Sequence, residues 1–221
     1  MFGRRRSAHW PVELSGTTPR GVAIRLRPMR VLDIAELGAV RRANAEWLRP
    51  WDATSPVRGQ LRSHEEVARA QEEQALAGEA MPFVIVVDGR IVGQLNVTNI
   101  VRGAFWSCTA GYWVAKSVAG QGVMPTALAL AGDHAFGALG LHRIEVNIRP
   151  ENAASLAVVR KLGFRDEGLR PRFLHIDGAW RDHRSFALTT EEVGRDGLMG
   201  RLLADHSSHM SDTPPQVRNG P

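Results

Sequence analysis

The chain has 221 residues and a mass of 24.3 kDa, which fits one large domain at the usual scale of about 150 residues per domain. A hydrophobic fraction of 43% with 23% charged residues excludes a wholly disordered chain. The single cysteine, Cys108, excludes an internal disulfide and a cysteine zinc cage. The chain therefore suits a reducing compartment, and we expect it in the cytoplasm.

The positive charge rests almost entirely on arginine. Lys and Arg total 28 against 23 Asp and Glu, which gives a net charge of +5, and the only lysines are Lys116 and Lys161. Because arginine does not deprotonate, this small excess carries the sequence pI to about 10.5. A value this high fits nucleic-acid binding, whereas the alternative is a compositional preference for arginine on an ordinary surface. Composition leaves both open.

Both ends of the chain are expected to lie outside the fold. The basic start is not followed by the apolar run of about 7–15 residues that an export signal needs. No segment reaches the roughly 18 apolar residues that span a bilayer, so no membrane partner is expected. Helical periodicity is lost from about residue 195. We therefore expect an N-terminal extension at 1–20, one domain at 21–194 and a disordered C-terminal tail at 195–221.

The first half of the chain shows patterns of strands and helices in a clear order. Asp33 is placed to cap one helix, and Ser63 with Glu66 predicts a capping box that opens a second, acidic helix. The pair Asp88-Gly89 supplies the positive φ angles of a tight β-hairpin turn. The alternating or β-rich segments predict strands at 22–27, 83–87, 91–97 and 105–114.

The second half continues with helices and strands in alternation. One helix is predicted after Gly120-Gln121-Gly122, and another from Asn152 to its stop at Gly163. Asp177-Gly178 marks a second hairpin turn. Strands are predicted at 142–148, 173–176 and 180–188. This order indicates one mixed α/β layer rather than a doubly wound parallel sheet.

The junction around Gly120-Gln121-Gly122 is the most informative local motif. Two glycines let the backbone turn tightly and direct N–H groups into one concavity, and the following helix adds its positive N-terminal end. Pro125 stands where a dinucleotide fingerprint needs a third glycine, and the Gly-Lys-Ser/Thr of a P-loop is absent. A pyrophosphate cradle and a mere tight turn are the alternatives.

The junction and the next helix together resemble the GNAT N-acetyltransferases. That family has an acetyl-coenzyme A loop of the form Gln/Arg-x-x-Gly-x-Gly/Ala and a following helix that begins Asn-x-x-Ser/Ala and ends Leu-Gly-Phe. Here Ser117 replaces the first residue of the loop pattern. Within the family the chain is similar to the ribosomal-protein alanine acetyltransferases of the RimJ type, from about residue 22 to 190. The resemblance is carried by the stretches 47–51, 99–105, 141–144, 160–164 and 176–183.

The resemblance implies a GNAT fold, a single mixed and mostly antiparallel sheet flanked by helices. It implies direct transfer of acetyl from acetyl-CoA, as co-substrate, to a protein N-terminal α-amine, by resemblance the N-terminal alanine of a small-subunit ribosomal protein. A small-molecule amine as acceptor, and a non-catalytic basic protein that binds RNA or the ribosome, are the alternatives. Neither metal nor DNA is expected, while ribosome association and oligomerisation stay open. The implied acetyl-CoA contacts are Tyr112, Trp113, Val114, Gly120, Gln121, Gly122, Val123, Met124, Pro125 and Asn152.

The resemblance also bears on the catalytic groups. Many relatives use a tyrosine as acid seven residues after the motif asparagine, but that place is Val159, and Tyr112 is the only tyrosine. That mechanism is therefore excluded here. By resemblance Ser155 is the acid, with a small packing residue as the alternative, and Glu145 is the candidate base, with a salt-bridged strand residue as the alternative. An α-amine has a pKa of about 7.7–8.0, so a strong base is not essential.

Two pairs of residues are candidates for a functional role because of their residue types. Trp47 and Trp51 are either core residues or the walls of a peptide-substrate mouth. Asp182 and His183 look like a catalytic pair, but neighbouring strand residues point to opposite faces, which favours a structural role.

Overall fold

A computed structural model describes residues 10–57 and 63–211. Its centre is one sheet of eight strands in the order β1-β2-β3-β4-β5-β6-β8-β7. Every neighbouring pair is antiparallel except β5 and β6, which run parallel. The strands are β1 (Leu14–Thr17), β2 (Ala23–Pro28), β3 (Met81–Val87), β4 (Arg90–Val101), β5 (Ser107–Val114), β6 (Arg143–Ile148), β7 (Arg165–Ile176) and β8 (Ala179–Thr189).

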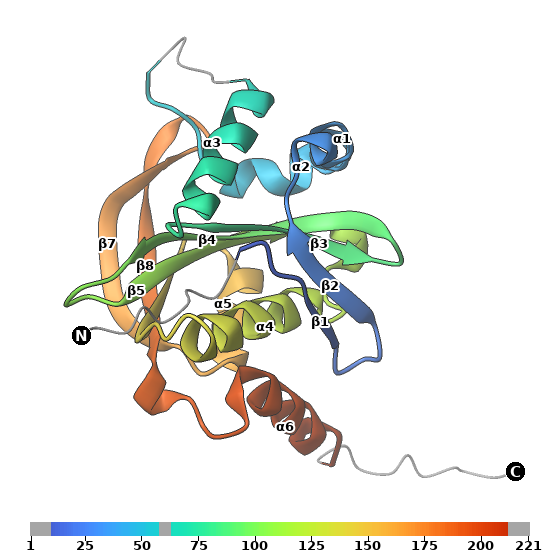
Figure 1. Ribbon diagram of the computed structural model, residues 1–221, viewed down its shortest axis with the longest axis vertical. Coiled ribbons are helices and arrows are strands. Elements are labelled where there is room, and N and C mark those ends of the chain that lie inside the picture. The colour runs from blue at the N-terminus through green and yellow to red at the C-terminus, as the bar shows by residue number, and fades with distance from the viewer. Residues whose placement is uncertain (1–9, 58–62, 212–221) are drawn as a thin grey trace, which may run out of the picture.

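Helices cover both faces of the sheet. Figure 1 shows α1, α2 and α3 above it and α4, α5 and α6 below it. The α-helices are α1 (Ile34–Ala43), α2 (Ala45–Leu48), α3 (His64–Leu76), α4 (Val123–Gly137), α5 (Ala153–Lys161) and α6 (Gly197–Ser211). Short 3-10 turns lie at Val31–Asp33, Arg49–Trp51, Lys116–Val118 and Thr190–Glu192. Among the described helices, none has the length and apolar character needed to cross a membrane.

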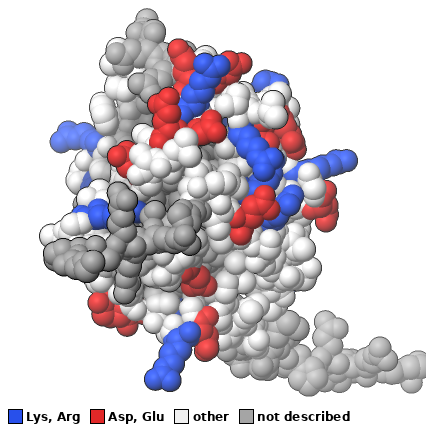
Figure 2. All heavy atoms as spheres, viewed as in Figure 1, with Lys and Arg blue, Asp and Glu red and all other residues white. Residues whose placement is uncertain are grey.

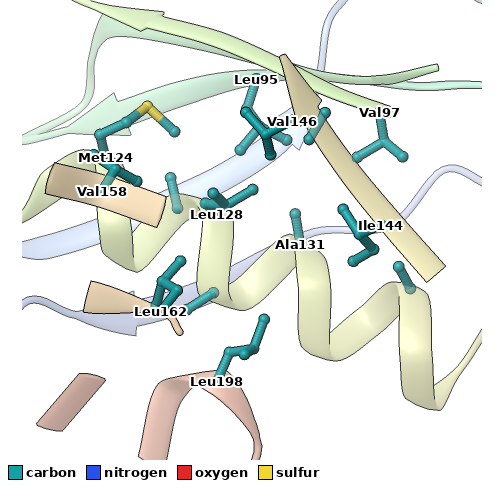
Figure 3. Close-up of a cluster of buried hydrophobic side chains, with 14 of the residues drawn as sticks. Leu95, Val97, Met124, Leu128, Ala131, Ile144, Val146, Val158, Leu162 and Leu198 are labelled. Carbon is teal, nitrogen blue, oxygen red and sulfur yellow. The ribbon is translucent and has the colours of Figure 1, made fainter. Parts of the chain in front are cut away.

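The main hydrophobic core lies between the sheet and α4. Figure 3 shows Leu128 and Ala131 of α4 facing the strand residues Leu95 and Val146, with Leu198 of α6 beneath them. A second cluster, which includes Met29, Leu37, Ala68 and Val84, lies on the other face under α1 and α3. β3 is buried along its whole length because both faces are covered.

The predicted turns and caps are largely confirmed. Asp88 and Gly89 have φ values of 49° and 75°, and the Asp177-Gly178 turn has 46° and 78°. The Ser63 hydroxyl accepts a hydrogen bond from Glu66 N at 3.1 Å, which completes the predicted capping box. Asp33 stands at the N-cap of α1 but makes no side-chain cap. Its carboxylate instead accepts hydrogen bonds from Arg27, the shorter at 2.6 Å.

The prediction that residues 1–20 form an extension outside the domain is wrong for the described part of that segment. β1 pairs antiparallel with β2, with Leu14 opposite Leu26. Trp10 packs edge-on against Phe83 at 5.2 Å between ring centroids. A strand of four residues is too short to show a clear two-residue periodicity, so the sequence pattern did not reveal it. Residues 1–9 lie outside the described residues.

The prediction of a disordered tail from residue 195 is wrong for residues 197–211, which form α6. Leu198 and Leu202, one helical turn apart, are buried in the main core. The two carboxylate oxygens of Asp133 on α4 accept hydrogen bonds from Leu198 N at 2.7 Å and Met199 N at 3.1 Å. The first turn of α6 is therefore capped by a distant residue. Residues 212–221 lie outside the described residues.

Removing this cap is expected to destabilise the protein. Asp133→Asn keeps the shape of the side chain but loses the charge that strengthens two hydrogen bonds, so the free energy of unfolding should fall by about 1–2 kcal/mol. Urea unfolding followed by circular dichroism measures this change. The exposed Asp196→Asn variant removes the same charge beside α6 and should stay within about 0.5 kcal/mol of wild type. Equal losses in both variants would contradict the capping role of Asp133.

Candidate active site

A cavity of about 700 Å³ lies along the C-terminal half of β5. β5 pairs with β6 only through Ser107–Thr109, although β5 continues to Val114. Beyond Thr109 this edge of β5 is therefore not in register with a strand, and an extended ligand can add backbone hydrogen bonds there. The cavity is lined by the segment after α1, by β4 and β5, by the start of α4 and by α5.

One end of the cavity is a cradle of backbone N–H groups. Gly120 and Gly122 have φ values of 76° and 82°, a left-handed backbone that favours glycine. Gly122 caps α4, and the first hydrogen bond within that helix runs from Thr126 N to Gly122 O at 3.2 Å. The N–H groups of Val123 and Met124 thus have no acceptor within the helix. A Cβ at Gly120 would meet nothing within 4 Å, so this cradle has room for an anion.

The structure places nine of the ten predicted coenzyme contacts on the wall of this cavity. They are Tyr112, Trp113, Val114, Gly120, Gly122, Val123, Met124, Pro125 and Asn152. Gln121 is the exception, because it lies outside the lining. Its backbone N–H is directed at Val118 O at 3.4 Å, and its side chain donates to Ser117 O at 2.8 Å. Gln121 therefore stabilises the loop rather than lining the cradle.

Ser155 reaches the cavity from the first turn of α5. Asn152 caps this helix, and its Oδ1 accepts a hydrogen bond from Ser155 N at 3.0 Å. The cap fixes the position of the serine, and both residues line the cavity. The predicted capping role of Asn152 is confirmed, and its side chain is also placed to face a ligand.

The side chain of Tyr112 is a feature that the sequence did not reveal. Its hydroxyl is buried and has no hydrogen-bond partner of good geometry among the described residues. Burial raises the pKa of Tyr112 above its ordinary value, and the adjacent Ser155 side chain only partly offsets this effect. The phenol therefore stays protonated near neutral pH. The tyrosine is not at the family's usual position, but its hydroxyl lies beside Ser155.

Glu145 does not lie on the wall of the cavity, so the geometry does not support its prediction as the base. β6 alternates, so Ile144 and Val146 are buried in the core while Glu145 faces the other side of the sheet. Arg143 Nε donates to Glu145 Oε1 at 2.9 Å, and Arg170 lies 3.5 Å from Oε2. Both carboxylate oxygens are thus paired with arginine. The salt-bridged alternative is the one observed.

Glu145→Gln is therefore expected to leave kcat within about twofold of wild type. The variant loses the negative charge that pairs with Arg143 and Arg170, so the free energy of unfolding should fall by about 1 kcal/mol. Steady-state rates and urea unfolding measure the two effects. Glu167→Gln is the matched control, because Glu167 also pairs with Arg143, and that pairing together with Arg165 lowers its pKa to about 2. A tenfold loss of kcat in Glu145→Gln but not in Glu167→Gln would show that Glu145 takes part in catalysis.

Another part of the cavity wall, which we call the mouth, carries aromatic and acidic residues. Trp47 and Trp51 both line it, which supports their interpretation as walls of a substrate mouth. Trp47 Nε1 donates to Val114 O at 3.1 Å, and this bond fixes the indole against β5. Asp52 and Glu151 add carboxylates to the same lining. Asp52 is paired with Arg41 at 2.7 Å and Glu151 with Arg149 at 3.2 Å, so these carboxylates are largely neutralised and the tryptophans define the mouth.

The pair Asp182 and His183 does not form a catalytic unit. Asp182 Oδ1 accepts a hydrogen bond from Arg172 N at 2.8 Å, while His183 is buried against Phe173. The two side chains serve different local contacts, as their opposite strand faces predict. Cys108 is also buried, and burial raises its pKa to about 12, so it is held as a neutral thiol. Among the described residues, no group of acidic, histidine and cysteine side chains could hold a metal ion.

Much of the arginine excess is neutralised locally. Arg27 pairs with Asp33, and Arg143 with Glu145 and Glu167. Figure 2 shows basic and acidic side chains interspersed on the face it displays. That face therefore does not offer the continuous basic surface expected of an RNA-binding module.

Comparison with known proteins agrees with this geometry. The model of the acetyltransferase (GNAT) domain family matches residues 23–165. The chain belongs to the GNAT acetyltransferase family. The probable N-acetyltransferase YjcK of Bacillus subtilis is a relative, 32% identical over 176 residues, which cover 76% of this chain and 95% of YjcK.

Two further GNAT relatives point to the RimJ type. The ribosomal-protein-uS5-alanine N-acetyltransferase of Escherichia coli is 34% identical over 155 residues, 67% of this chain and 78% of that protein. The structure of Mycobacterium smegmatis RimJ in complex with CoA-disulfide has a TM-score of 0.80 and 39% identity, and the match covers 88% of this chain and 95% of that one. The predicted GNAT fold and acetyltransferase activity are confirmed at the level of the family.

Proposed function

We propose that the protein transfers acetyl from acetyl-CoA directly to a protein N-terminal α-amine, with the N-terminal alanine of a small-subunit ribosomal protein as acceptor. The observation that carries this proposal is that one cavity holds both the glycine cradle and the tryptophan-walled mouth. A phosphate-bearing donor fits the cradle, and the N-terminal residues of a peptide fit between the tryptophans of the mouth. The alanine acceptor and the donor rest on the relatives in E. coli and M. smegmatis.

Bound acetyl-CoA supplies an acetyl group as a thioester. The backbone of Gly120, Val123 and Met124 would hold its pyrophosphate, and the free edge of β5 would hold its pantetheine arm. The amine nitrogen forms a bond to the acetyl carbon, the carbon–sulfur bond breaks, and the amine loses a proton. No residue forms a covalent bond with the acetyl group.

Ser155 and Tyr112 are the groups that can donate a proton to the departing thiolate. Both residues line the cavity, and Tyr112 is held protonated by its burial. We assign the donor role to Ser155, with Tyr112 beside it as the source that restores its proton. A water molecule can take the proton of the amine, because an α-amine with a pKa of about 7.7–8.0 is already partly neutral near neutral pH. This favours an α-amine over a lysine as acceptor.

Acetyl transfer monitored by mass tests the proposal. The purified protein is incubated with acetyl-CoA and a panel of ribosomal-protein N-terminal peptides, free amino acids and aminoglycosides. The proposal expects transfer to alanine-starting peptides. Transfer to a small amine with none to any α-amine of a peptide would overturn it in favour of a small-molecule acetyltransferase. Strongly salt-dependent RNA affinity without any transfer would favour the non-catalytic alternative.

A further inference from the structure

Asn96 carries an unexplained polar atom at the cavity. Its Oδ1 is buried and has no hydrogen-bond partner among the described residues. An unsatisfied buried oxygen costs about 1–3 kcal/mol, so native structures rarely keep one without a purpose. Asn96 also lines the cavity that joins the cradle to the mouth. This oxygen is therefore placed to accept a hydrogen bond from a ligand.

The space beside Asn96 is open because of Gly111. The β4–β5 register places Gly111 directly opposite Asn96. A Cβ added at Gly111 would meet nothing within 4 Å, and Gly111 also lines the cavity. An unpaired acceptor oxygen thus stands next to room for a small group.

Asn96 lies on the sheet face opposite the candidate proton donors. Gln94, two residues earlier on β4, donates to Met29 Sδ at 3.3 Å, and Met29 belongs to the cluster under α1 and α3. Asn96 shares that face because side chains on a strand alternate. Tyr112 follows Gly111 on β5 and packs instead against the core on the α4 side, where Ser155 of α5 also lies. An amine held on one face of the sheet and a proton donor for the sulfur on the other face would therefore not compete for the same space.

We infer that Asn96 Oδ1 accepts an N–H hydrogen bond from the acceptor α-amine and that Gly111 leaves the room for the first side chain of the acceptor. This inference rests on the proposed function and names its amine-binding position. A neutral amine can donate one N–H to Asn96 while its lone pair stays free to attack. A carboxamide oxygen orients the amine without the full negative charge that would favour the unreactive ammonium form.

Two substitutions of Asn96 test separately the loss of its acceptor oxygen and the addition of a negative charge. Asn96→Leu keeps a similar size and removes the acceptor oxygen, so kcat/KM for an alanine-starting peptide should fall at least tenfold while KM for acetyl-CoA stays within about twofold. Asn96→Asp keeps an acceptor and adds a charge that stabilises the ammonium form. The apparent pKa of the amine in the pH profile of kcat/KM should therefore rise by about one unit. The other titratable groups of the lining are unchanged in both variants: Asp52, Tyr112, Glu151 and Lys161.

Thr98→Val is the matched control on the same strand face. Thr98 lies two residues beyond Asn96, outside the cavity lining, and its replacement should leave both KM values unchanged. Thermal unfolding confirms that each variant folds, and Asn96→Asp keeps the test valid if the leucine variant does not. Wild-type kinetics for the peptide in Asn96→Leu, or an unshifted pH profile in Asn96→Asp, would overturn the inference.

A failure of the Asn96 inference can be distinguished from a failure of the proposed function. If the wild-type protein acetylates a small amine and no peptide, the proposed function fails, but the same variants can be compared on that amine. Loss of amine use in Asn96→Leu would then still support the binding position. If the wild-type protein acetylates peptides and Asn96→Leu does so equally well, only the inference fails.

Discussion

Gly122→Asp is expected to weaken coenzyme A binding by about 10- to 100-fold, on the order of 1.4–2.8 kcal/mol. The new carboxylate would stand at the N-terminal end of α4, in the cradle that we assign to the pyrophosphate. It would repel the phosphates and would itself take up the positive field of the helix end. Calorimetric titration of coenzyme A into the folded variant measures the change.

Gly122→Asn is the matched control for this substitution. Both variants place a Cβ about 3.3 Å from Thr18 Cβ and need the same left-handed backbone, so their comparison isolates the charge. The asparagine variant should bind coenzyme A more tightly than the aspartate variant, and the gap should narrow as salt rises. Wild-type affinity in Gly122→Asp would remove this loop from the coenzyme site.

Ser155→Ala is expected to lower kcat about 100-fold, which is typical of the loss of a positioned proton donor. The affinity for coenzyme A should change by no more than about twofold, because the pyrophosphate contacts are made elsewhere. Thiol release under saturating acetyl-CoA and peptide measures kcat. Ser117→Ala is the control, since Ser117 lies in the nearby loop outside the cavity lining. Normal kcat in Ser155→Ala would show that this hydroxyl is not the donor.

Tyr112→Phe is expected to lower kcat by removing the second hydroxyl of the proton path. If Tyr112 supplies Ser155 with its proton, the phenylalanine variant should lose about 10-fold in kcat, and the double variant should be little worse than Ser155→Ala. Because burial raises the pKa of Tyr112, the wild-type rate should rise with pH as the amine deprotonates and show no fall up to pH of about 10. Additive losses in the double variant would mean that the two hydroxyls act separately.

The parts of the fold that follow local rules could be predicted from the sequence. Asp88-Gly89 and Asp177-Gly178 form the expected turns because Asp-Gly pairs readily adopt the positive φ angles that a tight hairpin turn needs. Asn152 caps α5 and Gly122 caps α4 for the same local reasons. The glycine cradle and the capped start of α5 that carries Ser155 could therefore be predicted from motifs.

The parts that depend on distant contacts could not be predicted in the same way. The first half of α6 carries Leu198, Leu202 and two further apolar residues at helical spacing, but its cap comes from the distant Asp133, and Leu198 is buried in the core. The alternation of β6 predicts that Glu145 and Ile144 face opposite sides of the sheet. It does not predict that arginines from two strands form ion pairs with the Glu145 carboxylate. Asn96 carries no motif, and its importance rests on an oxygen that only the packing leaves unpaired.

We propose that this cavity delivers acetyl to a protein α-amine. The most direct test is a single peptide that begins with alanine and carries an internal lysine, incubated with acetyl-CoA and the wild-type protein. Tandem mass spectrometry then locates the acetyl group. Acetylation of the alanine nitrogen with the lysine unmodified is expected. Acetylation of the lysine in preference to the α-amine would contradict it.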